Sequence, residues 1–218
     1  MEKIKNIRKR LRHQRSVRRR KLGLSTPTQI ICVSFIIVIA LGTLLLTLPI
    51  ASRHGRLDVL NAMFTATSAT CVTGLVVRDT WTQFTWFGQA VVLLLIQVGG
   101  LGLVTLTSFF ALAMRRRMGF RDLRLLGESV SADGYDQAKS VLKIVVGLAA
   151  MFEGIGILLL LFAFVPQFGL EGVWISVFTA ISAFCNAGFD LFGRFGAYSS
   201  LAPYVNNYYV QAVIMFMI

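Results

Sequence analysis

The sequence predicts an all-α membrane protein made of repeated units, each with a helix, a short re-entrant segment and a second helix. Three observations support this fold class: long uncharged apolar runs, positive charge gathered in two segments, and an internal repeat. Of the 218 residues, 56% are hydrophobic and 15% are charged. In a soluble helical protein the charges would recur along amphipathic faces, so this composition indicates a polytopic membrane protein.

Four apolar runs are long enough to cross a bilayer as helices, which takes roughly 20 residues for about 30 Å of hydrocarbon. Three of the runs look complete and the fourth stops at the last residue, so we expect the chain to be a fragment of a longer protein. Glu153 is the one charged residue inside them. The runs are 22–52, 81–114, 144–165 and 195–218.

Positive charge is concentrated in two segments. The net charge is +12, and residues 1–22 hold 11 of the 22 Lys and Arg while residues 114–143 hold 7. The positive-inside rule places both segments in the cytoplasm. We therefore expect a multi-pass protein of the cell membrane, surrounded by the lipid bilayer, with a cytoplasmic N-terminus and no nucleic-acid partner.

An internal repeat relates the two halves of the chain. Residues 64–76 (FTATSATCVTGLV) and 178–190 (FTAISAFCNAGFD) are identical at 7 of 13 positions, at a constant offset of 114. Each copy follows a long apolar run and precedes another. The sequence therefore predicts the same unit twice.

The first short segment, residues 59–77, is 19 uncharged residues long and so could cross the membrane. Crossing would put the basic segment 115–143 outside, against the positive-inside rule. A helix capped by Asp58 and ending at Thr70 would be about 20 Å long and would reach only the middle of the bilayer. We therefore predict a re-entrant helix followed by an extended return.

The return segment would leave backbone groups unpaired, which membranes tolerate only inside protein or beside a watery cavity. Gly74 and Gly188 can adopt a positive φ, which lets successive carbonyls face one way. A helix C-terminus followed by a row of carbonyls favours a dehydrated cation. The alternative is a Ser/Thr-rich helix that packs through small residues, and the recurrence of the segment argues against it.

The motifs resemble the Trk/Ktr/HKT superfamily of potassium transporters, most closely the membrane subunit of bacterial Ktr. The resemblance runs from about Pro27 to the end of the chain and implies helix, re-entrant pore-loop, helix units as in potassium channels, with the first two of four units present here. The stretches that carry it are FTATSATCVTGLVVRDTWTQFTWFGQ, IQVGGLGLVTLTSFFALAMRRRMGFRDLRLLGESV and FTAISAFCNAGFDLF.

The resemblance implies potassium uptake through a selectivity filter, with the potassium ion bound by backbone carbonyls and sodium as a second candidate ion. Relatives with serine at the position of Gly74 tend to favour sodium, so the glycine favours potassium. The implied partners are a second membrane subunit in a homodimer and a cytosolic ring of nucleotide-binding subunits, with sodium-stimulated uptake. The implied filter residues are Val72, Thr73, Gly74, Leu75, Asn186, Ala187, Gly188 and Phe189, of which Val72, Thr73, Gly74, Asn186, Ala187 and Gly188 offer their carbonyls to potassium.

Four charged residues stand close to these segments or within a span. Asp79 and Asp190 follow the two filters, where they either attract cations to the outer mouth or hydrogen-bond the loops. Glu153 lies mid-span and should face protein or water, either in a helix-helix hydrogen bond or in contact with the ion. Arg78 departs from the family pattern: its charge either lowers the local potassium concentration at the outer mouth or points toward the lipid headgroups with no effect, and we expect the second.

These observations divide the chain into a basic cytoplasmic N-terminal arm (1–26), a first helix, pore-loop, helix repeat (27–114), a cytoplasmic linker (115–139) and a second repeat with a truncated last helix (140–218). Cys32, Cys71 and Cys185 lack metal-site spacing, and the sequence has no phosphate-binding Gly loop or nucleophile elbow, so we expect no enzyme. The alternative function is a non-conducting membrane scaffold that recruits a cytosolic partner through its basic segments.

Overall fold

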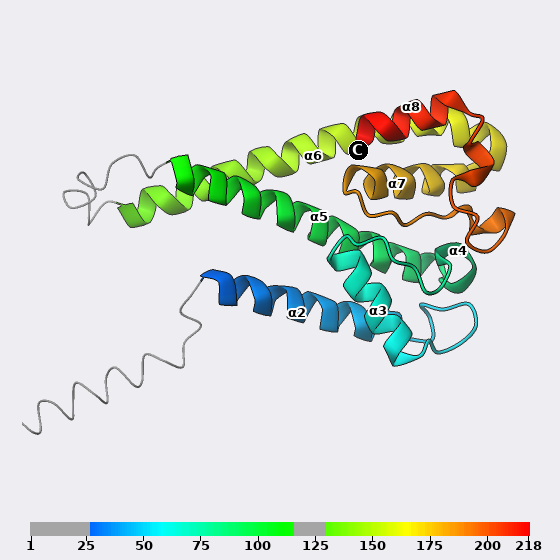
Figure 1. Cartoon of the computed structure of the whole chain (residues 1–218), viewed down its shortest axis with the longest axis horizontal. Coiled ribbons are helices and arrows are strands. Elements are labelled where there is room, and N and C mark those ends of the chain that lie inside the picture. The colour runs from blue at the N-terminus through cyan, green and yellow to red at the C-terminus, as the bar shows by residue number, and fades with distance from the viewer. Residues whose placement is uncertain (1–26, 116–129) are drawn as a thin grey trace, which may run out of the picture. The chain divides into compact units, whose positions relative to one another are not determined.

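The computed structural model describes residues 27–115 and 130–218 of the chain (Figure 1). The chain divides into two compact units, Met1–Val38 and Ile39–Ile218. The described part of the first unit is the beginning of helix α2. The second unit contains the rest of α2 and all the other elements.

Each copy of the repeat contains a long helix, a short helix and a further helix, in that order along the chain (Figure 1). Apart from one antiparallel bridge between Ser52 and Phe84, the described residues form helices, turns and loops. The first copy contains α2 (Pro27–Leu46), α3 (Val59–Thr70), α4 (Thr80–Gln83) and α5 (Trp86–Arg115). The second contains α6 (Val130–Phe168), α7 (Leu170–Phe184), the 3₁₀ helices η2 (Phe192–Phe195) and η3 (Ala202–Tyr204), and α8 (Tyr208–Met217).

The short helices α3 and α7 are shorter than α2, α5 and α6, which have 20, 30 and 39 residues. The two short helices have 12 and 15 residues, which corresponds to about 18 and 22 Å at 1.5 Å per residue, less than the hydrocarbon thickness. Within the described residues, one stretch, Lys143–Phe168 in α6, is long and apolar enough to cross a membrane by length and composition. Both short helices therefore end before they could cross.

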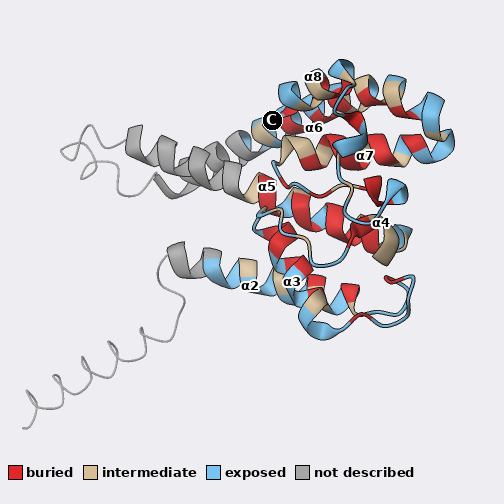
Figure 2. Ribbon diagram, turned by 45° about the vertical axis from the view of Figure 1, so that its right-hand side comes forward, coloured by how far each residue is buried: buried red, intermediate tan, exposed pale blue. Residues whose placement is uncertain are grey.

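Helix α5 lies at the centre of the second unit, in contact with α3, α6 and α7. Buried residues gather along the middle of α5 and along the helices that flank it (Figure 2). Val92 and Ile96 of α5 are fully buried, and Gln89 on the same helix accepts a hydrogen bond from Trp174 Nε1 of α7 at 2.8 Å. The central helix thus joins the two copies of the repeat.

Helix α6 begins at Val130, inside the segment that the sequence assigns to the linker and ahead of the predicted start of the second repeat at residue 140. The polar stretch VSADGYDQAK that opens the helix contains no proline and a single glycine, Gly134. One glycine costs roughly 1 kcal/mol relative to alanine in a helix, which a 39-residue helix tolerates. The segment assigned to the linker thus includes the polar start of α6, and the stretch of α6 that is apolar enough to cross a membrane begins at Lys143.

Candidate functional site

The chain turns sharply where α3 ends. The last helical hydrogen bond of α3 runs from the Cys71 amide to the Thr67 carbonyl, at 2.8 Å. Two residues later the Thr73 amide donates to the Ser68 carbonyl at 3.0 Å, so the chain turns back toward the helix here. Val72 takes a φ of +55° and Gly74 a φ of +73°. Left-handed backbone is natural for glycine but is an outlier for a β-branched residue such as Val72.

The second copy repeats this path residue for residue at the offset of 114. The Cys185 amide bonds to the Ile181 carbonyl at 3.0 Å, and the Ala187 amide bonds to the Ser182 carbonyl at 2.8 Å. Asn186 has a φ of +56° and Gly188 a φ of +70°. Two different sequences thus adopt the same alternation of positive and negative φ, so the conformation belongs to the repeat and not to one local sequence.

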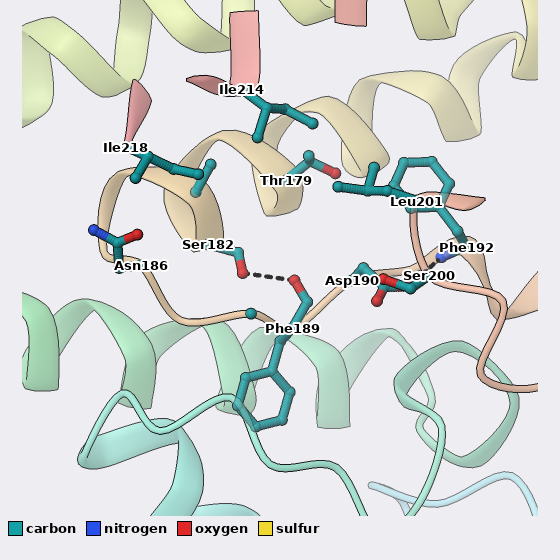
Figure 3. Close-up of a pocket in the computed structure, with 12 residues that line it drawn as sticks. Thr179, Ser182, Asn186, Phe189, Asp190, Phe192, Ser200, Leu201, Ile214 and Ile218 are labelled. Carbon is teal, nitrogen blue, oxygen red and sulfur yellow. Dashed lines mark hydrogen bonds between the residues drawn. The ribbon is translucent and has the colours of Figure 1, made fainter. Parts of the chain in front are cut away.

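A serine of each short helix holds the end of the segment that follows it. Ser68 Oγ donates to the Leu75 carbonyl at 2.7 Å, and Ser182 Oγ donates to the Phe189 carbonyl at 2.5 Å (Figure 3). Both serines are buried. Each bond joins residues seven positions apart, so it holds the end of the return segment against the helix that precedes it. The serine hydroxyl does not bond the other carbonyls of the segment.

The two segments meet at their glycines. A Cβ built on Gly74 would lie 3.0 Å from the Ala187 carbonyl oxygen and 3.5 Å from Gly188 Cα. A Cβ built on Gly188 would lie 3.2 Å from Gly74 Cα. The structure therefore brings together the two segments that the sequence singled out, with backbone against backbone.

The C-terminal ends of the two short helices converge on one patch of α5. A Cβ on Gly99 would collide with the Thr70 carbonyl oxygen at the end of α3, and a Cβ on Gly100 would collide with Cys185 at the end of α7. The C-terminus of a helix carries a partial negative charge. The glycines of α5 thus allow two such ends to approach the same region.

A hydrogen-bonded chain leads from mid-span to the second segment. Gln97 Nε2 on α5 donates to Glu153 Oε1 on α6 at 2.7 Å, and Glu153 is 7% exposed. Cys185 Sγ lies 3.9 Å from Gln97 Oε1, within range of a weak thiol hydrogen bond. Glu153 therefore makes a helix-helix contact, one of the two roles expected of it.

Asp79 is 7% exposed and caps α4, where its Oδ1 accepts from the Thr82 amide at 2.8 Å. Asp190 follows the second segment, and its Oδ1 accepts from the Phe192 amide at 3.0 Å. Burial raises the pKa of Asp190, and the nearby charge of Asp79 raises it further, against lowering contributions from Phe192 and Ser200. Both carboxylates thus hydrogen-bond the loops beyond the segments. Arg78 beside Asp79 is exposed.

A cavity of 220 Å³ lies beside the second segment, between α7 and α8 (Figure 3). Thr179, Asn186 and Asp190 are among the residues that line it. In the part of the chain that the structure describes, the buried Thr179 Oγ1 has no hydrogen-bond partner. Among the described residues there is also no group of three or more His, Cys, Asp or Glu that could hold a metal ion.

Sequence reasoning missed three residues of this region. Gln97 and Gln89 stand in an uncharged apolar run. Polar side chains in such a run indicate hydrogen bonds between helices, so the sequence does carry a signal for these two residues. Tyr198 gave no signal, because its contacts reach residues more than a hundred positions away. The two copies also differ in exposure at the last position of the segment, where Leu75 is 60% exposed and Phe189, its counterpart, is 3% exposed.

Comparison with known proteins gives one family and several relatives. The TrkH family, described as cation transport proteins, matches residues 4–218. The chain is 38% identical over 193 residues to the Ktr system potassium uptake protein B of Bacillus subtilis, 36% over 190 residues to the potassium/sodium uptake protein NtpJ of Enterococcus hirae, and 37% over 180 residues to the Ktr system potassium uptake protein B of Vibrio alginolyticus. These matches cover 88%, 86% and 82% of this chain and 42%, 41% and 38% of the relatives.

Proposed function

The chain belongs to the TrkH family of cation transport proteins, and on that premise we propose that residues 71–75 and 185–189 are two walls of a potassium-selective pore in the cell membrane. In this proposal α3 and α7 are re-entrant pore helices. The protein acts in potassium uptake, with the ion as its transported substrate. Potassium would be bound by the backbone carbonyls of Val72, Thr73, Gly74, Asn186, Ala187 and Gly188.

The observation that carries the proposal is the meeting of the two segments at Gly74 and Gly188, each with the same alternation of φ. In this proposal the alternation lets successive carbonyls face one side of the chain. Two such segments held side by side would then offer two rows of carbonyl oxygens to an ion. Carbonyl rows that replace the hydration shell of an ion are how potassium-selective filters are built.

The charge distribution supports a cation as the substrate. Two helix C-termini converge at Gly99 and Gly100 of α5, and each carries a partial negative charge near the inner end of its segment. No full positive charge stands in either segment. A dehydrated cation would therefore meet a negative potential without having to compete with a lysine or arginine.

Potassium is the proposed ion because the three relatives are named for potassium uptake, one of them for potassium and sodium. Within this chain, glycine at position 74 supports potassium over sodium. The Ktr names further support a multi-subunit system. We include in the proposal a homodimer of the membrane subunit, a cytosolic ring of nucleotide-binding subunits, sodium stimulation of uptake and a cytoplasmic N-terminus.

Replacement of Gly74 by serine in the full-length protein tests the filter. Gly74→Ser places a side chain against the Ala187 carbonyl and forces a left-handed residue with a Cβ, so we expect potassium preference over sodium to fall. The measurement is growth of potassium-uptake-deficient bacteria at low potassium, together with uptake of each ion. Gly55→Ser is the matched control, because Gly55 has a φ of +86° but no atom within 4 Å of its Cβ position. Unchanged ion preference in Gly74→Ser would refute the filter assignment.

A further inference from the structure

We propose that Asp79 and Tyr198 are positioning residues for ion selection, forming a clamp that fixes the distance between the two filter segments from outside the filter. The clamp consists of Asp79 and the loop 196–200. It rests on the function proposed above, because it acts on the same two segments. The proposal concerns residues that neither offer a carbonyl to the ion nor lie in a filter segment.

The clamp makes two hydrogen bonds between the repeats. The Tyr198 amide donates to Asp79 Oδ2 at 3.0 Å, and the Tyr198 hydroxyl donates to the Val77 carbonyl at 2.9 Å. Val77 is three residues beyond Gly74, so the hydroxyl holds the exit of the first segment. One residue of the second repeat thus grips the first repeat at two points, 119 and 121 positions away in sequence.

The same loop also contacts the chain that follows the second segment. Ser199 Oγ donates to the Phe192 carbonyl at 2.6 Å, and the Phe192 amide donates to Asp190 Oδ1 at 3.0 Å. Asp190 directly follows Phe189 at the end of that segment, and both Ser200 and Asp190 line the cavity beside it (Figure 3). The loop therefore connects the exits of the two filters, through Tyr198 to Asp79 and through Ser199 and Phe192 to Asp190. A shift of the loop would move both exits relative to each other.

Backbone strain in the loop supports a positioning role. Tyr198 has a φ of +63° and Ser200 a φ of +48°, both in the left-handed region that side chains other than glycine rarely adopt. Strained residues persist where the surrounding contacts over-determine them, and they cluster at sites that need a fixed geometry. Here the contacts that hold the loop are those of Tyr198 to Asp79 and Val77 and that of Ser199 to Phe192.

A glycine of the second repeat makes room for the Asp79 carboxylate. A Cβ on Gly193, which lies in η2, would overlap both oxygens of that carboxylate. Asp79 stands at the N-cap of α4, so this contact joins α4 of the first repeat to η2 of the second. The absence of a side chain at residue 193 therefore lets the two repeats pack closely beyond the filter segments.

The test compares Asp79→Asn and Tyr198→Phe in the full-length transporter. Asp79→Asn leaves one acceptor oxygen where the carboxylate had two, and Tyr198→Phe removes only the bond to Val77. We expect the ratio of potassium to sodium uptake to fall roughly threefold to tenfold in Asp79→Asn and by a smaller factor in Tyr198→Phe, since hydrogen bonds to a charged group contribute more than those to a neutral one. Surface abundance and thermal stability are measured alongside.

Tyr209→Phe is the matched control, because the Tyr209 hydroxyl also donates to a backbone carbonyl, that of Leu159, at 2.9 Å, away from the filter segments. It should leave the ratio unchanged. If Asp79 instead attracts cations electrostatically, Asp79→Asn will raise the KM for both ions by the same factor with an unchanged ratio, and the clamp is wrong. Unchanged ratios in both clamp variants, with an altered ratio in Gly74→Ser, would overturn the clamp and leave the proposed filter standing. Unchanged ratios in all three would refute the filter itself.

Discussion

Gly74 and Gly188 approach so closely that a methyl group added to Gly188 would lie 3.2 Å from the α-carbon of Gly74. Both residues have a positive φ, and they occupy equivalent positions, 114 residues apart, in the internal repeat. Glycine is therefore required at these positions for two separate reasons, the backbone conformation and the contact with the other copy. Equivalent residues of the two copies of the repeat are thus in direct contact at this pair of glycines.

We predict that Gly188→Ala impairs potassium uptake about as strongly as the equivalent change at Gly74. A left-handed alanine costs roughly 1 to 2 kcal/mol, and the added methyl presses on the backbone of the other segment. We expect uptake of potassium, measured in cells at low external potassium, to fall roughly tenfold or more, which corresponds to about 1.4 kcal/mol.

Gly55→Ala provides the control for this prediction. Gly55 carries a comparable strain at φ +86° but has open space around its Cβ position. It should lower stability slightly and leave ion uptake intact. An equal loss of uptake in Gly55→Ala would mean that conformational strain alone, and not the meeting of the segments, explains the effect.

We predict that Val72→Asn is tolerated and raises stability. Val72 is a β-branched residue at φ +55°, whereas its counterpart Asn186 has nearly the same φ of +56° and a side chain that suits left-handed backbone. The swap should relieve roughly 1 kcal/mol of strain. Thermal unfolding of the purified full-length protein measures it, with Val76→Asn, outside the left-handed positions, as the control that should not gain stability. A lower unfolding temperature for Val72→Asn would contradict the prediction that the valine is strained at this position.

Much of this arrangement follows from local sequence, and the rest does not. The sequence alone predicts three features: the offset of 114, the end of α3 at Thr70, and glycine at 74 and 188. A repeat is visible in the sequence itself, and a glycine indicates backbone that other residues rarely adopt. Asp58 does stand at the predicted N-cap of α3, although its side chain makes no capping hydrogen bond there.

Val72 has left-handed backbone, whereas a β-branched residue favours the extended conformation. Its conformation is therefore imposed by the surrounding fold, and residue preference alone would have predicted an extended residue there. The contact of Tyr198 with Asp79 joins residues 119 positions apart, and no periodic pattern encodes such a pair. The role of Asp79 therefore stayed open between attraction of cations and a hydrogen bond to a loop. Its burial and its two backbone partners favour the second.

Glu153 gives a prediction that separates its two expected roles. Glu153→Gln keeps an oxygen that can accept from Gln97 Nε2, whereas Glu153→Leu leaves that amide without its partner inside the membrane. If the helix-helix contact is its role, Glu153→Gln should transport potassium within about twofold of the natural protein. Glu153→Leu should lose stability by roughly 1 to 3 kcal/mol, the cost of an unpaired polar group.

Rates of potassium uptake and unfolding temperatures of the two Glu153 variants measure this difference. Leu158→Gln, at an exposed position of α6, controls for the presence of an extra amide on the same helix. A large loss of uptake in Glu153→Gln with unchanged stability would instead favour direct contact between the carboxylate and the ion.

The proposed re-entrant course of α3 can be tested by labelling, because it would place both ends of the segment on the same side of the membrane. Arg56 precedes α3 and Arg78 follows the first segment, and both are exposed. In a full-length protein from which the natural cysteines are removed, we expect Arg56→Cys and Arg78→Cys each to react with a membrane-impermeant thiol reagent added outside intact cells.

A cysteine placed in the basic N-terminal arm, for example Ser16→Cys, should react only after the cells are opened if that arm is cytoplasmic, as the positive-inside rule predicts. If α3 and its return crossed the membrane, Arg56→Cys and Arg78→Cys would react from opposite sides. Labelling of both from outside requires the backbone between them to turn inside the protein, since a chain that turns back in lipid would leave several amides and carbonyls unpaired at several kcal/mol each. The carbonyls of residues 71–75 would then have to face either protein or a water-filled path for ions.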